Sequence, residues 1–443
     1  MSSEVSRDVK ELLDSAVELH RNGDLTGAEA EYLQVLEADP DHADAHHLLG
    51  VIAHQIGGTE LAIERVKQSL AIKPDQPTAL NNLGNMLALA ERLNEAVECY
   101  ERAIELNADY AQAHHNLGNV LSDLARYQES LDAYERAIEL RPDDLPSRLA
   151  MGTMLDRMAQ FDRAVVEFRK VLDIDGDSLS ALSRLGAVLR KMNRLDEAKE
   201  VYDRWLELTP ENPIAMHLRE ACDPETAPDR ASDEYVKATF DGFAQDFDDV
   251  LAELDYRVPE LLGEMAERYL ANLRRTDLRV ADLGCGTGLC AQHLRGHAER
   301  LVGVDLSPGM LAKANQRDIY DELVESELTG YLEGFSEEFD LLVAADTLIY
   351  LGDLQSTFAA AHNALRSEGA LLFSVERLSD DAVDVEYRLD PFGRYAHKEA
   401  LARRWLEEAG LEPQEIVETT LRKEGNDDVT GYLVLASKRE AAC

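Results

Sequence analysis

Small and hydrophobic side chains recur at a fixed spacing through the first half of the chain. A column of small residues returns every 34 positions, at Ala16, Gly50, Gly84, Gly118, Gly152 and Gly186. A second small column lies twelve positions after the first, and a mostly aromatic column, from Tyr32 to Tyr202, lies four positions after the second. This period of 34 residues predicts six helical hairpins over about residues 9–212, with a capping helix over Pro213–Ala221.

The residue types in these columns suit a stack of helical hairpins. Two antiparallel helices approach closely only where small side chains face each other. We therefore expect the aromatic side chain of each second helix to fill the gap to the next hairpin. Proline recurs near the end of four units and stops the second helix there, at Pro40, Pro74, Pro142 and Pro210.

The pattern changes after residue 222. The segment Asp223–Asp233 has neither helical nor strand periodicity, which indicates an exposed linker. Short hydrophobic runs then alternate with amphipathic segments of helix length, which predicts a mostly parallel sheet with helices on both faces. The runs lie at residues 279–283, 300–305, 339–345, 369–375 and 430–436. The predicted domains are therefore a repeat domain at 1–222, a linker at 223–233 and an α/β domain at 234–443.

A glycine-rich loop follows the first predicted strand. The segment from Val280 to Gly288 reads VADLGCGTG, and glycine lets a backbone turn sharply and lets a ligand lie against it. Its DxGxGxG spacing differs from the GxGxxG of dinucleotide sites, which disfavours a nicotinamide-dependent oxidoreductase. Asp305 ends the second predicted strand, 21 residues beyond the first loop glycine, where a carboxylate can accept hydrogen bonds from both hydroxyls of a ribose.

Two resemblances follow from these motifs. The repeats resemble tetratricopeptide repeats, and residues 233–438 resemble class I S-adenosylmethionine-dependent methyltransferases, most closely the bacterial ones with N-terminal repeats of this kind. The second rests on VADLGCGTG, VDLSPGML, FDLLVAADTLIYLGDL, FDGFAQDFDDVLAELDYRVPELL and GRYAHKEALARRWLEEAGL. The implied fold is an α-solenoid followed by an α/β domain with a doubly wound, mostly parallel sheet. The implied cofactor is S-adenosyl-L-methionine.

The second resemblance also implies the roles of residues in the donor site. The loop glycines would cradle the methionine part, Asp305 would hold the ribose, and the pair Glu327 and Leu328 would flank the adenine. The sequence around this pair, LVESELTGYL, departs from the Asp that the family usually has after its third strand. The complete set of donor-site candidates is Asp282, Gly284, Gly286, Gly288, Asp305, Leu306, Glu327, Leu328 and Arg257. The guanidinium of Arg257 would bind the carboxylate of the donor or would be an ordinary surface cation.

Three residues are candidates for the chemistry of methyl transfer. Asp346 follows the fourth predicted strand, where this fold opens its active site, and Tyr350 lies one helical turn later. His397 is the candidate general base, because histidine titrates near neutrality, although a purely packing role is the alternative. A carboxylate acceptor needs no base, whereas a hydroxyl or a protonated amine does. The aromatic residues Phe240, Phe243 and Phe247 either pack over the sheet or form a lid.

The charge balance limits the possible partners. Lys and Arg number 45 against 87 Asp and Glu, which gives a net charge of −42. Such a surface repels nucleic acids and anionic membranes, unless the acidity only serves solubility. The five cysteines lack the spacing of a zinc site or a disulfide framework, and we expect a cytoplasmic protein without an export signal or membrane span. The cysteines are Cys99, Cys222, Cys285, Cys290 and Cys443.

The repeats are expected to bind a protein or peptide partner on their concave face. The first helices of the third and fourth units carry Asn82, Asn85, Asn116 and Asn119, and amides of this kind can pair with the backbone of an extended peptide. The alternative is that these amides bond neighbouring helices. A second function remains open, that of an adaptor that binds partners and retains only the donor site. The sequence predicts neither the methyl acceptor nor the oligomeric state.

Overall fold

The structure is a computed structural model of the 443-residue chain. It describes residues 8–223, 227–273, 277–379, 382, 385–424 and 427–439. The chain divides into two compact units, Met1–Val188 and Leu189–Cys443, which are described separately.

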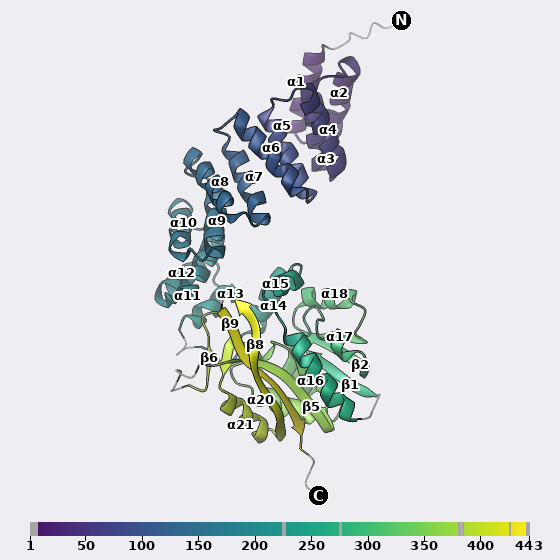
Figure 1. The fold of residues 1–443 in the computed structure, drawn as a ribbon, viewed down its shortest axis with the longest axis vertical. Helices are drawn as coiled ribbons and strands as arrows, with labels where there is room; N and C mark the ends of the chain where they lie inside the picture. The colour runs from purple at the N-terminus through teal and green to yellow at the C-terminus, as the bar shows by residue number, and fades with distance from the viewer. Residues whose placement is uncertain are drawn as a thin grey trace. The chain divides into compact units, whose positions relative to one another are not determined.

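The first unit consists of helical hairpins at the predicted period (Figure 1). Its complete helices are α1 Val9–Arg21, α2 Leu25–Ala38, α3 Ala43–Gln55, α4 Thr59–Ile72, α5 Pro77–Leu89, α6 Leu93–Leu106, α7 Ala111–Asp123, α8 Tyr127–Leu140, α9 Leu145–Arg157 and α10 Phe161–Ile174. The next hairpin is formed by α11 Leu179–Lys191, through which the division passes, and α12 Leu195–Leu208, and α13 Pro213–Ala221 follows as the expected cap. A helical hairpin therefore stands at each of the six predicted units.

A left-handed turn residue joins the two helices of each hairpin at the same 34-residue spacing. These residues have positive φ angles between 54° and 85°, at Gly23, Gly57, Glu91, Ala125, Ala159 and Asn193. Only the first two are glycines, so the other four hairpins hold an L-residue in a conformation that glycine adopts more easily. The turn is thus imposed by the packing of the helices.

The aromatic column packs inside its own hairpin. A Cβ atom on Gly118 would lie 2.6 Å from the ring of Tyr134, and one on Gly84 would lie 2.5 Å from the ring of Tyr100. Tyr100 also belongs to one buried cluster with Leu117 and Leu121 of the next unit, so the expectation that the aromatic column fills the gap to the next unit stays a prediction. The glycine and the aromatic residue face each other across the helix pair. Because glycine has no side chain, the ring can pack directly against its backbone.

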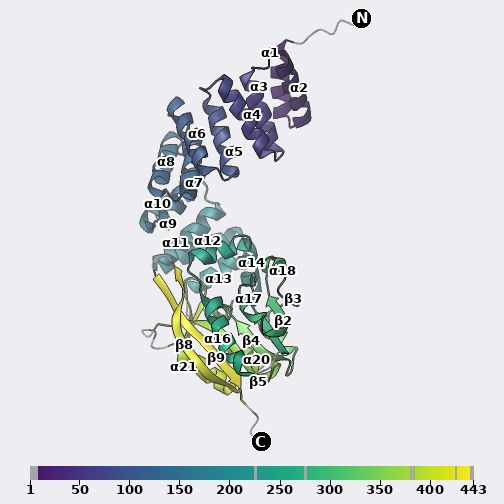
Figure 2. The same ribbon diagram turned by 45° about the vertical axis from the view of Figure 1, so that its right-hand side comes forward.

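The second unit contains a nine-stranded sheet (Figures 1 and 2). The strands are β1 Leu278–Leu283, β2 Ala298–Asp305, β3 Glu322–Glu325, β4 Phe339–Ala344, β5 Leu365–Arg377, β6 Tyr387–Leu389, β7 Tyr395–His397, β8 Leu411–Glu424 and β9 Asp427–Lys438. The order β3-β2-β1-β4-β5 is parallel throughout, β9 pairs with β5 in the antiparallel sense, and β8 pairs with β9. The five predicted strands are all present, and the mostly parallel α/β fold is confirmed.

Helices cover both faces of this sheet. One face packs against α19 Leu328–Glu333, α20 Gln355–Ala364 and α21 Glu399–Glu408, which bury Leu332, Phe358 and Trp405. The other face packs against α16 Val258–Leu273 and α17 Ala291–Leu294. Since the central strands β1, β4 and β5 are buried along most of their length, a ligand can reach them only at their ends.

The segment predicted as an exposed linker packs onto the sheet domain in its described part. The backbone N–H of Ala231 donates to the carbonyl of Tyr350 at 2.8 Å, and the hydroxyl of Tyr395 donates to the carbonyl of Pro228 at 2.5 Å. Ala231 is 1% exposed. The expectation of an exposed segment is therefore wrong for Ala231, whose backbone bonds to the loop after β4, whereas Asp229 and Arg230 are exposed as expected. The domain boundary at 223–233 itself stays a prediction.

Candidate functional site

The glycine-rich loop turns back at the carboxyl end of β1. Gly284, Gly286 and Gly288 have φ angles of +69°, +54° and +91°, a region that L-residues rarely adopt. A Cβ on Gly284 would lie 2.3 Å from the side chain of Thr347, so no other residue fits there. By contrast, a Cβ on Gly286 would meet nothing closer than Phe247 at 3.9 Å, which leaves open space above the backbone.

Asp305 is tied to this loop. Its carboxylate accepts a hydrogen bond from the backbone N–H of Gly286 at 2.8 Å and another from Ser307 at 2.8 Å. Burial raises the pKa of Asp305, while these two N–H groups act in the opposite direction. The carboxylate is thus fixed beside the open space above Gly286, where it can also accept hydrogen bonds from a ligand.

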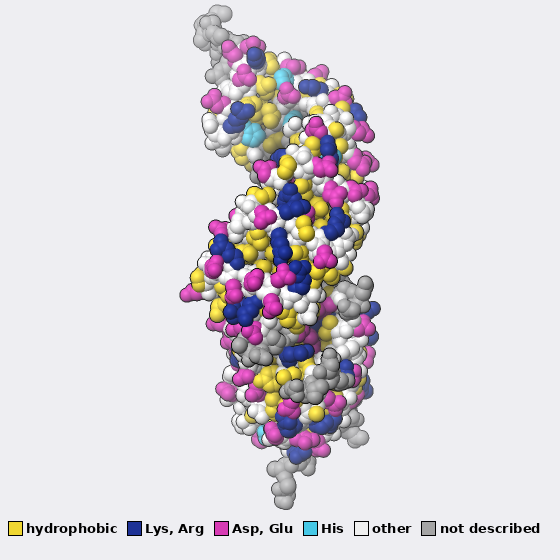
Figure 3. Space-filling view, turned by 90° about the vertical axis from the view of Figure 1, so that its left-hand side faces the viewer, with side chains coloured by type: hydrophobic (Ala, Val, Ile, Leu, Met, Phe, Trp, Pro, Cys, Tyr) yellow, Lys and Arg dark blue, Asp and Glu magenta, His cyan; other side chains and the backbone are white. Residues whose placement is uncertain are grey.

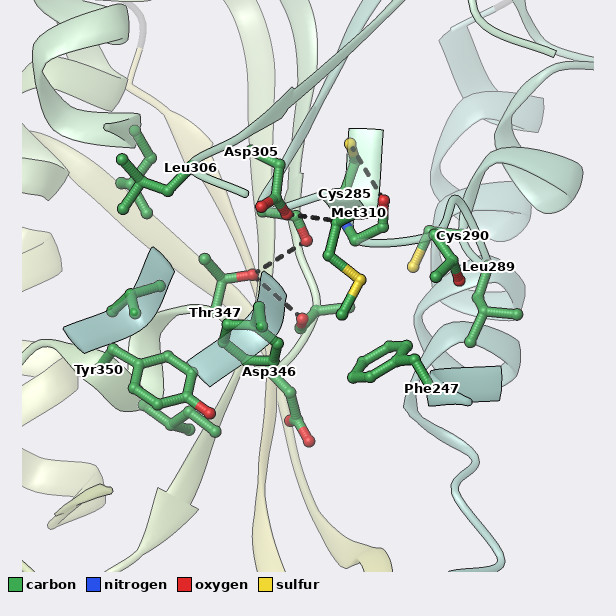
Figure 4. Close-up of a pocket in the computed structure, with 18 of the residues that line it drawn as sticks. Phe247, Cys285, Leu289, Cys290, Asp305, Leu306, Met310, Asp346, Thr347 and Tyr350 are labelled. Carbon is green, nitrogen blue, oxygen red and sulfur yellow. Dashed lines mark hydrogen bonds between the residues drawn. The ribbon is translucent and has the colours of Figure 1, made fainter. Parts of the chain in front are cut away.

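A cavity of about 270 Å³ opens at this edge of the sheet. Its lining includes nine of the twelve predicted site residues, namely Asp282, Gly284, Gly286, Asp305, Leu306, Glu327, Leu328, Asp346 and Tyr350. Figure 4 shows Asp305 and Thr347 in its upper part, Phe247 and Tyr350 on opposite sides, and Asp346 below. The fold therefore collects residues from the ends of β1, β2, β3 and β4.

Two further acidic side chains lie in this cavity. Asp282 is 1% exposed and accepts a hydrogen bond from the hydroxyl of Tyr320 at 2.6 Å. Burial raises its pKa to about 7, although the bond from Tyr320 lowers it. Glu327 caps α19 by accepting a hydrogen bond from the N–H of Gly330 at 2.7 Å. It also forms an ion pair with Arg230 at 3.7 Å, which holds this carboxylate at the rim.

Two short helices close the cavity on one side. They are α14 Asp233–Phe243 and α15 Phe247–Glu253, and they contribute Phe240, Phe247 and several aliphatic side chains to the lining. The ring of Phe240 lies edge-on to Tyr350, with centroids 5.5 Å apart. Phe240 and Phe247 therefore pack at the cavity, and a lid over the methyl donor stays a prediction. The side chain of Phe243 lies outside the described residues.

The position of Arg257 corrects its predicted role. Its side chain is about half exposed and pairs with Glu260 at 3.1 Å on the same helix. It is absent from the described lining of the cavity, where its neighbour Tyr256 is present. Gly288 is also absent from that lining, and its role is to turn the loop.

The position of His397 corrects the prediction of a general base. Its side chain is fully buried, and its Nε2 hydrogen-bonds with the carbonyl of Gly352 at 2.9 Å. The rings of Tyr387 and Trp405 pack against it. Burial lowers the pKa of His397 to about 4, and the residue is not among those described as lining the cavity. The alternative of a packing role is therefore the one that the geometry supports.

A buried charged cluster lies at the Asp346 end of the cavity. Asp346 has a φ of +49°, and its carboxylate accepts hydrogen bonds from Ser374 at 2.7 Å and from Arg422 at 2.9 Å. Burial raises the pKa of Asp346, and Arg422 opposes this rise. Asp346 is not a glycine, so its positive φ is strained, and both oxygens of its carboxylate accept hydrogen bonds. The surrounding structure therefore fixes this residue in place.

The rest of this cluster was not predicted from the sequence. Arg422 also bonds with Glu376 and with Glu424, and Arg394 bonds with the same two carboxylates at 2.7 and 2.6 Å. Three carboxylates thus face two guanidinium groups. These residues come from β5, β8 and the turn before β7, and nothing in their local sequence indicates that they meet.

Comparisons with known proteins agree with this geometry. The family described as "Methyltransferase domain" matches residues 281–373, and families described as "Tetratricopeptide repeat" match residues 13–77, 75–143 and 157–222. A ubiquinone biosynthesis O-methyltransferase of Thiobacillus denitrificans (strain ATCC 25259 / T1) is 30% identical over 188 residues, which cover 37% of this chain and 79% of that protein. The chain belongs to the class I methyltransferases and carries tetratricopeptide repeats.

Other relatives of this methyltransferase match shorter parts. A Geobacillus sp. (strain WCH70) protein that is named as a methyltransferase is 32% identical over 31% of this chain and 57% of its own length. The bifunctional protein BioHC of biotin biosynthesis from Saccharophagus degradans (strain 2-40 / ATCC 43961 / DSM 17024) is 32% identical over 22% of this chain, which spans 18% of that protein. The solved structure of MamA is 28% identical, with a TM-score of 0.35, over 36% of this chain and 94% of MamA.

In the repeats of the methyltransferase, the predicted asparagines bond neighbouring helices. The Oδ1 of Asn85 accepts hydrogen bonds from the hydroxyl of Tyr100 at 2.7 Å and from Asn116 at 2.9 Å. In the same way, Asn119 accepts from Tyr134 at 2.7 Å. Both Asn85 and Asn119 remain exposed. On the face in Figure 3, basic, acidic and hydrophobic side chains are interspersed over the repeats.

Two further features concern the described residues as a whole. No group of three or more His, Cys, Asp or Glu side chains there could hold a metal ion. Among the described helices, none is both long enough and apolar enough to cross a membrane.

Proposed function

We propose that the chain transfers the methyl group of S-adenosyl-L-methionine and that its repeats bind a protein partner or substrate. The observation that carries the first part is the loop of three positive-φ glycines bonded to Asp305, with open space above Gly286. A nucleoside with a ribose needs a fixed carboxylate beside a backbone that it can approach closely, and this site offers both.

The lining residues fit the parts of this donor. Asp282 lies beside the loop, where a carboxylate can pair with the ammonium of the methionine part. We assign Asp305 to the ribose hydroxyls and Glu327 and Leu328 to the adenine, because all three line the same cavity. S-adenosyl-L-methionine supplies an electrophilic methyl group on a sulfonium when it is bound. The aromatic and aliphatic side chains of α14 and α15 exclude water from the same cavity.

The charged cluster is the proposed acceptor end. Asp346 is a poor base because both of its oxygens already accept hydrogen bonds. Glu424 also lines the cavity, its side chain is 27% exposed, and the hydrogen bonds that it accepts from Arg394 and Arg422 all reach Oε1. We propose Glu424 as the group that takes the proton from a hydroxyl or an amine acceptor. A carboxylate acceptor would need no such base.

Donor binding is tested by calorimetry with S-adenosylhomocysteine. Replacing Asp305 by Ala removes a carboxylate that can bond both ribose hydroxyls, and we expect the affinity to fall about tenfold or more. Glu333→Ala is the matched control, because Glu333 is an exposed acidic residue on α19. Unchanged affinity in Asp305→Ala would contradict the site. Binding of NADH in place of S-adenosylhomocysteine would favour an oxidoreductase.

The acceptor is sought with a labelled methyl donor in cell lysate, with protein and small-molecule products separated. Transfer to protein supports a substrate that the repeats select. Donor binding without any transfer would favour the adaptor, which keeps only the donor site.

For the repeats, capture of partners is compared between the wild type and a variant with Asn82, Asn85, Asn116 and Asn119 replaced by Ala. Circular dichroism checks that the helices survive, and an identical set of captured proteins would contradict binding through these amides.

A further inference from the structure

A histidine of the capping helix reaches into the methyltransferase domain. His217 of α13 is 3% exposed, and its Nε2 hydrogen-bonds with the backbone carbonyl of Gly393 at 2.9 Å. Burial lowers the pKa of His217. A neutral imidazole with its proton on Nε2 donates this bond, so the ring is both buried and satisfied on that side.

The same ring packs on the lid. The rings of His217 and Tyr235 are stacked, with centroids 3.8 Å apart, and Tyr235 belongs to α14. Gly393 has a φ of +85°, and a Cβ there would lie 2.9 Å from the hydroxyl of Tyr235 and 3.2 Å from the ring of His217. The turn before β7 is thus pressed against both rings, with no room for a side chain at Gly393.

Three more interactions fix this turn. The carboxylate of Asp390 accepts hydrogen bonds from the N–H groups of Phe392 at 2.7 Å and Arg394 at 2.9 Å. From the last repeat, the guanidinium of Arg190 donates to the carbonyl of Pro391. The turn is therefore held from inside by Asp390 and from outside by α11 and α13.

The residue that follows this turn enters the acceptor end of the cavity. Arg394 lines the cavity and donates to Glu376 at 2.7 Å and to Glu424 at 2.6 Å. Its side chain is 17% exposed. Because Glu376 and Glu424 also bind Arg422, a shift of Arg394 would leave the buried Glu376 and the partly buried Glu424 with one guanidinium between them.

We propose that His217 is a positioning residue for methyl transfer, which acts through Gly393 to hold Arg394 at the acceptor end. The last repeat helices are then part of the active site, and they set its acceptor end and not its donor end. This inference rests on the proposed function for its meaning in catalysis. We call the hold of His217 and Arg190 on Arg394, through the turn at Pro391–Gly393, the clamp. Whether the clamp fixes Arg394 can be tested without a methyl acceptor.

Two variants separate the interactions of His217. His217→Phe keeps a ring on Tyr235 and removes the bond to Gly393, whereas His217→Gln keeps a donor for that bond and removes the ring. The readout is the rate at which phenylglyoxal modifies Arg394 in the full chain, measured by peptide mass spectrometry against the exposed Arg403. We expect Arg394 to react about fivefold faster in His217→Phe and at nearly the wild-type rate in His217→Gln.

Binding of S-adenosylhomocysteine is measured in the same variants and should stay within about twofold of wild type, because His217 does not touch the donor end. Equal labelling of Arg394 in wild type and His217→Phe overturns the proposal. So does labelling that is as fast in His217→Gln as in His217→Phe, or faster, because loss of the ring alone would then release Arg394. If His217→Phe does not fold, Arg190→Gln is measured in its place, and unchanged labelling there overturns the clamp. Failure of the wild type to bind S-adenosylhomocysteine would contradict the proposed function and leave the labelling result standing.

Discussion

At the scale of single residues, Asp282 gives the donor site a dependence on pH. Its pKa is raised to about 7 by burial, so the carboxyl is largely protonated below that pH. A donor ammonium binds the ionised form, and we expect the affinity for S-adenosylhomocysteine to rise from about pH 5.5 to about pH 7, by at most tenfold per pH unit. Calorimetry at several pH values measures this rise. Asp282→Asn should flatten it, and an equally steep rise in that variant would assign the titration to another group.

We expect His397 to affect the stability of the fold and not the chemistry of methyl transfer. Its pKa falls from 6.5 to about 4 on folding, because the buried ring stays neutral. Between these values the unfolded chain binds the additional proton, so this residue's contribution to stability is complete above pH 6.5 and is lost as the pH falls toward 4.

The corresponding variant is His397→Gln, which keeps a donor for the carbonyl of Gly352 and does not titrate. We expect its melting temperature to fall less than that of the wild type between about pH 7 and about pH 5, with unchanged affinity for S-adenosylhomocysteine. The same fall in both proteins would show that His397 does not contribute. A large loss of methyl transfer with wild-type stability and donor binding would restore it as a base.

Single residues were predictable from the sequence where the chemistry is local. The loop glycines and Asp305 lie within a short segment, so their spacing alone placed them at one edge of the sheet. Arg394 and Arg422 meet Asp346 only because β5, β7 and β8 converge there. His397 ends β7, and its side chain lies in the core and not in the cavity. All three residues of this short strand are buried, so its sequence does not indicate which side chain would face a ligand.

At the scale of elements, the contact between glycine and aromatic ring within each hairpin carries a prediction. A Cβ on Gly118 would lie 2.6 Å from the ring of Tyr134, which is itself buried and bonded to Asn119. Gly118→Ala should therefore destabilise the repeats by about 1–3 kcal/mol, despite the better helix propensity of alanine. Urea unfolding followed by circular dichroism measures this loss.

The matched control is Gly176→Ala. A Cβ on Gly176 would meet only the carbonyl of Leu172, at 3.7 Å, and its φ is not positive. We expect this variant to remain within about 0.5 kcal/mol of wild type. Equal stability of both variants would mean that the hairpin adapts to the extra methyl group and that the glycine column is not required by packing.

Elements were predictable where their period was long or their burial complete. The 34-residue register repeats six times, and the five predicted strands are continuous hydrophobic runs. Strand β8 was missed because its burial alternates only in part and charged residues interrupt it. Ala231 was taken as exposed because a backbone hydrogen bond to a distant loop leaves no pattern in the side chains.

At the scale of the whole molecule, the division into compact units differs from the division in the sequence pattern. The repeat period runs on to residue 212, whereas the second compact unit begins at Leu189. Packing accounts for the difference, since Arg190 and His217 both bond to the turn at Pro391–Gly393. A period reports how each hairpin is built and not which neighbour buries its outer face.

This division predicts how the chain can be cut. A fragment of residues 177–443 keeps all of α11, α12 and α13, and we expect it to unfold cooperatively and to bind S-adenosylhomocysteine as the full chain does. A fragment of residues 232–443 follows the boundary predicted from the sequence, but it lacks the ring of His217 that covers Tyr235. Exposing this buried face should lower the melting temperature of the fragment by about 2–4 °C for each kcal/mol of stability lost, the ratio expected for a domain of this size.

Calorimetric melting and donor titration of both fragments decide between the two boundaries. Equal melting temperatures and equal donor affinities would show that the last hairpin and its cap add nothing to the methyltransferase domain, and the boundary at 223–233 would stand. If the longer fragment alone behaves like the full chain, the terminal repeat belongs to the catalytic unit.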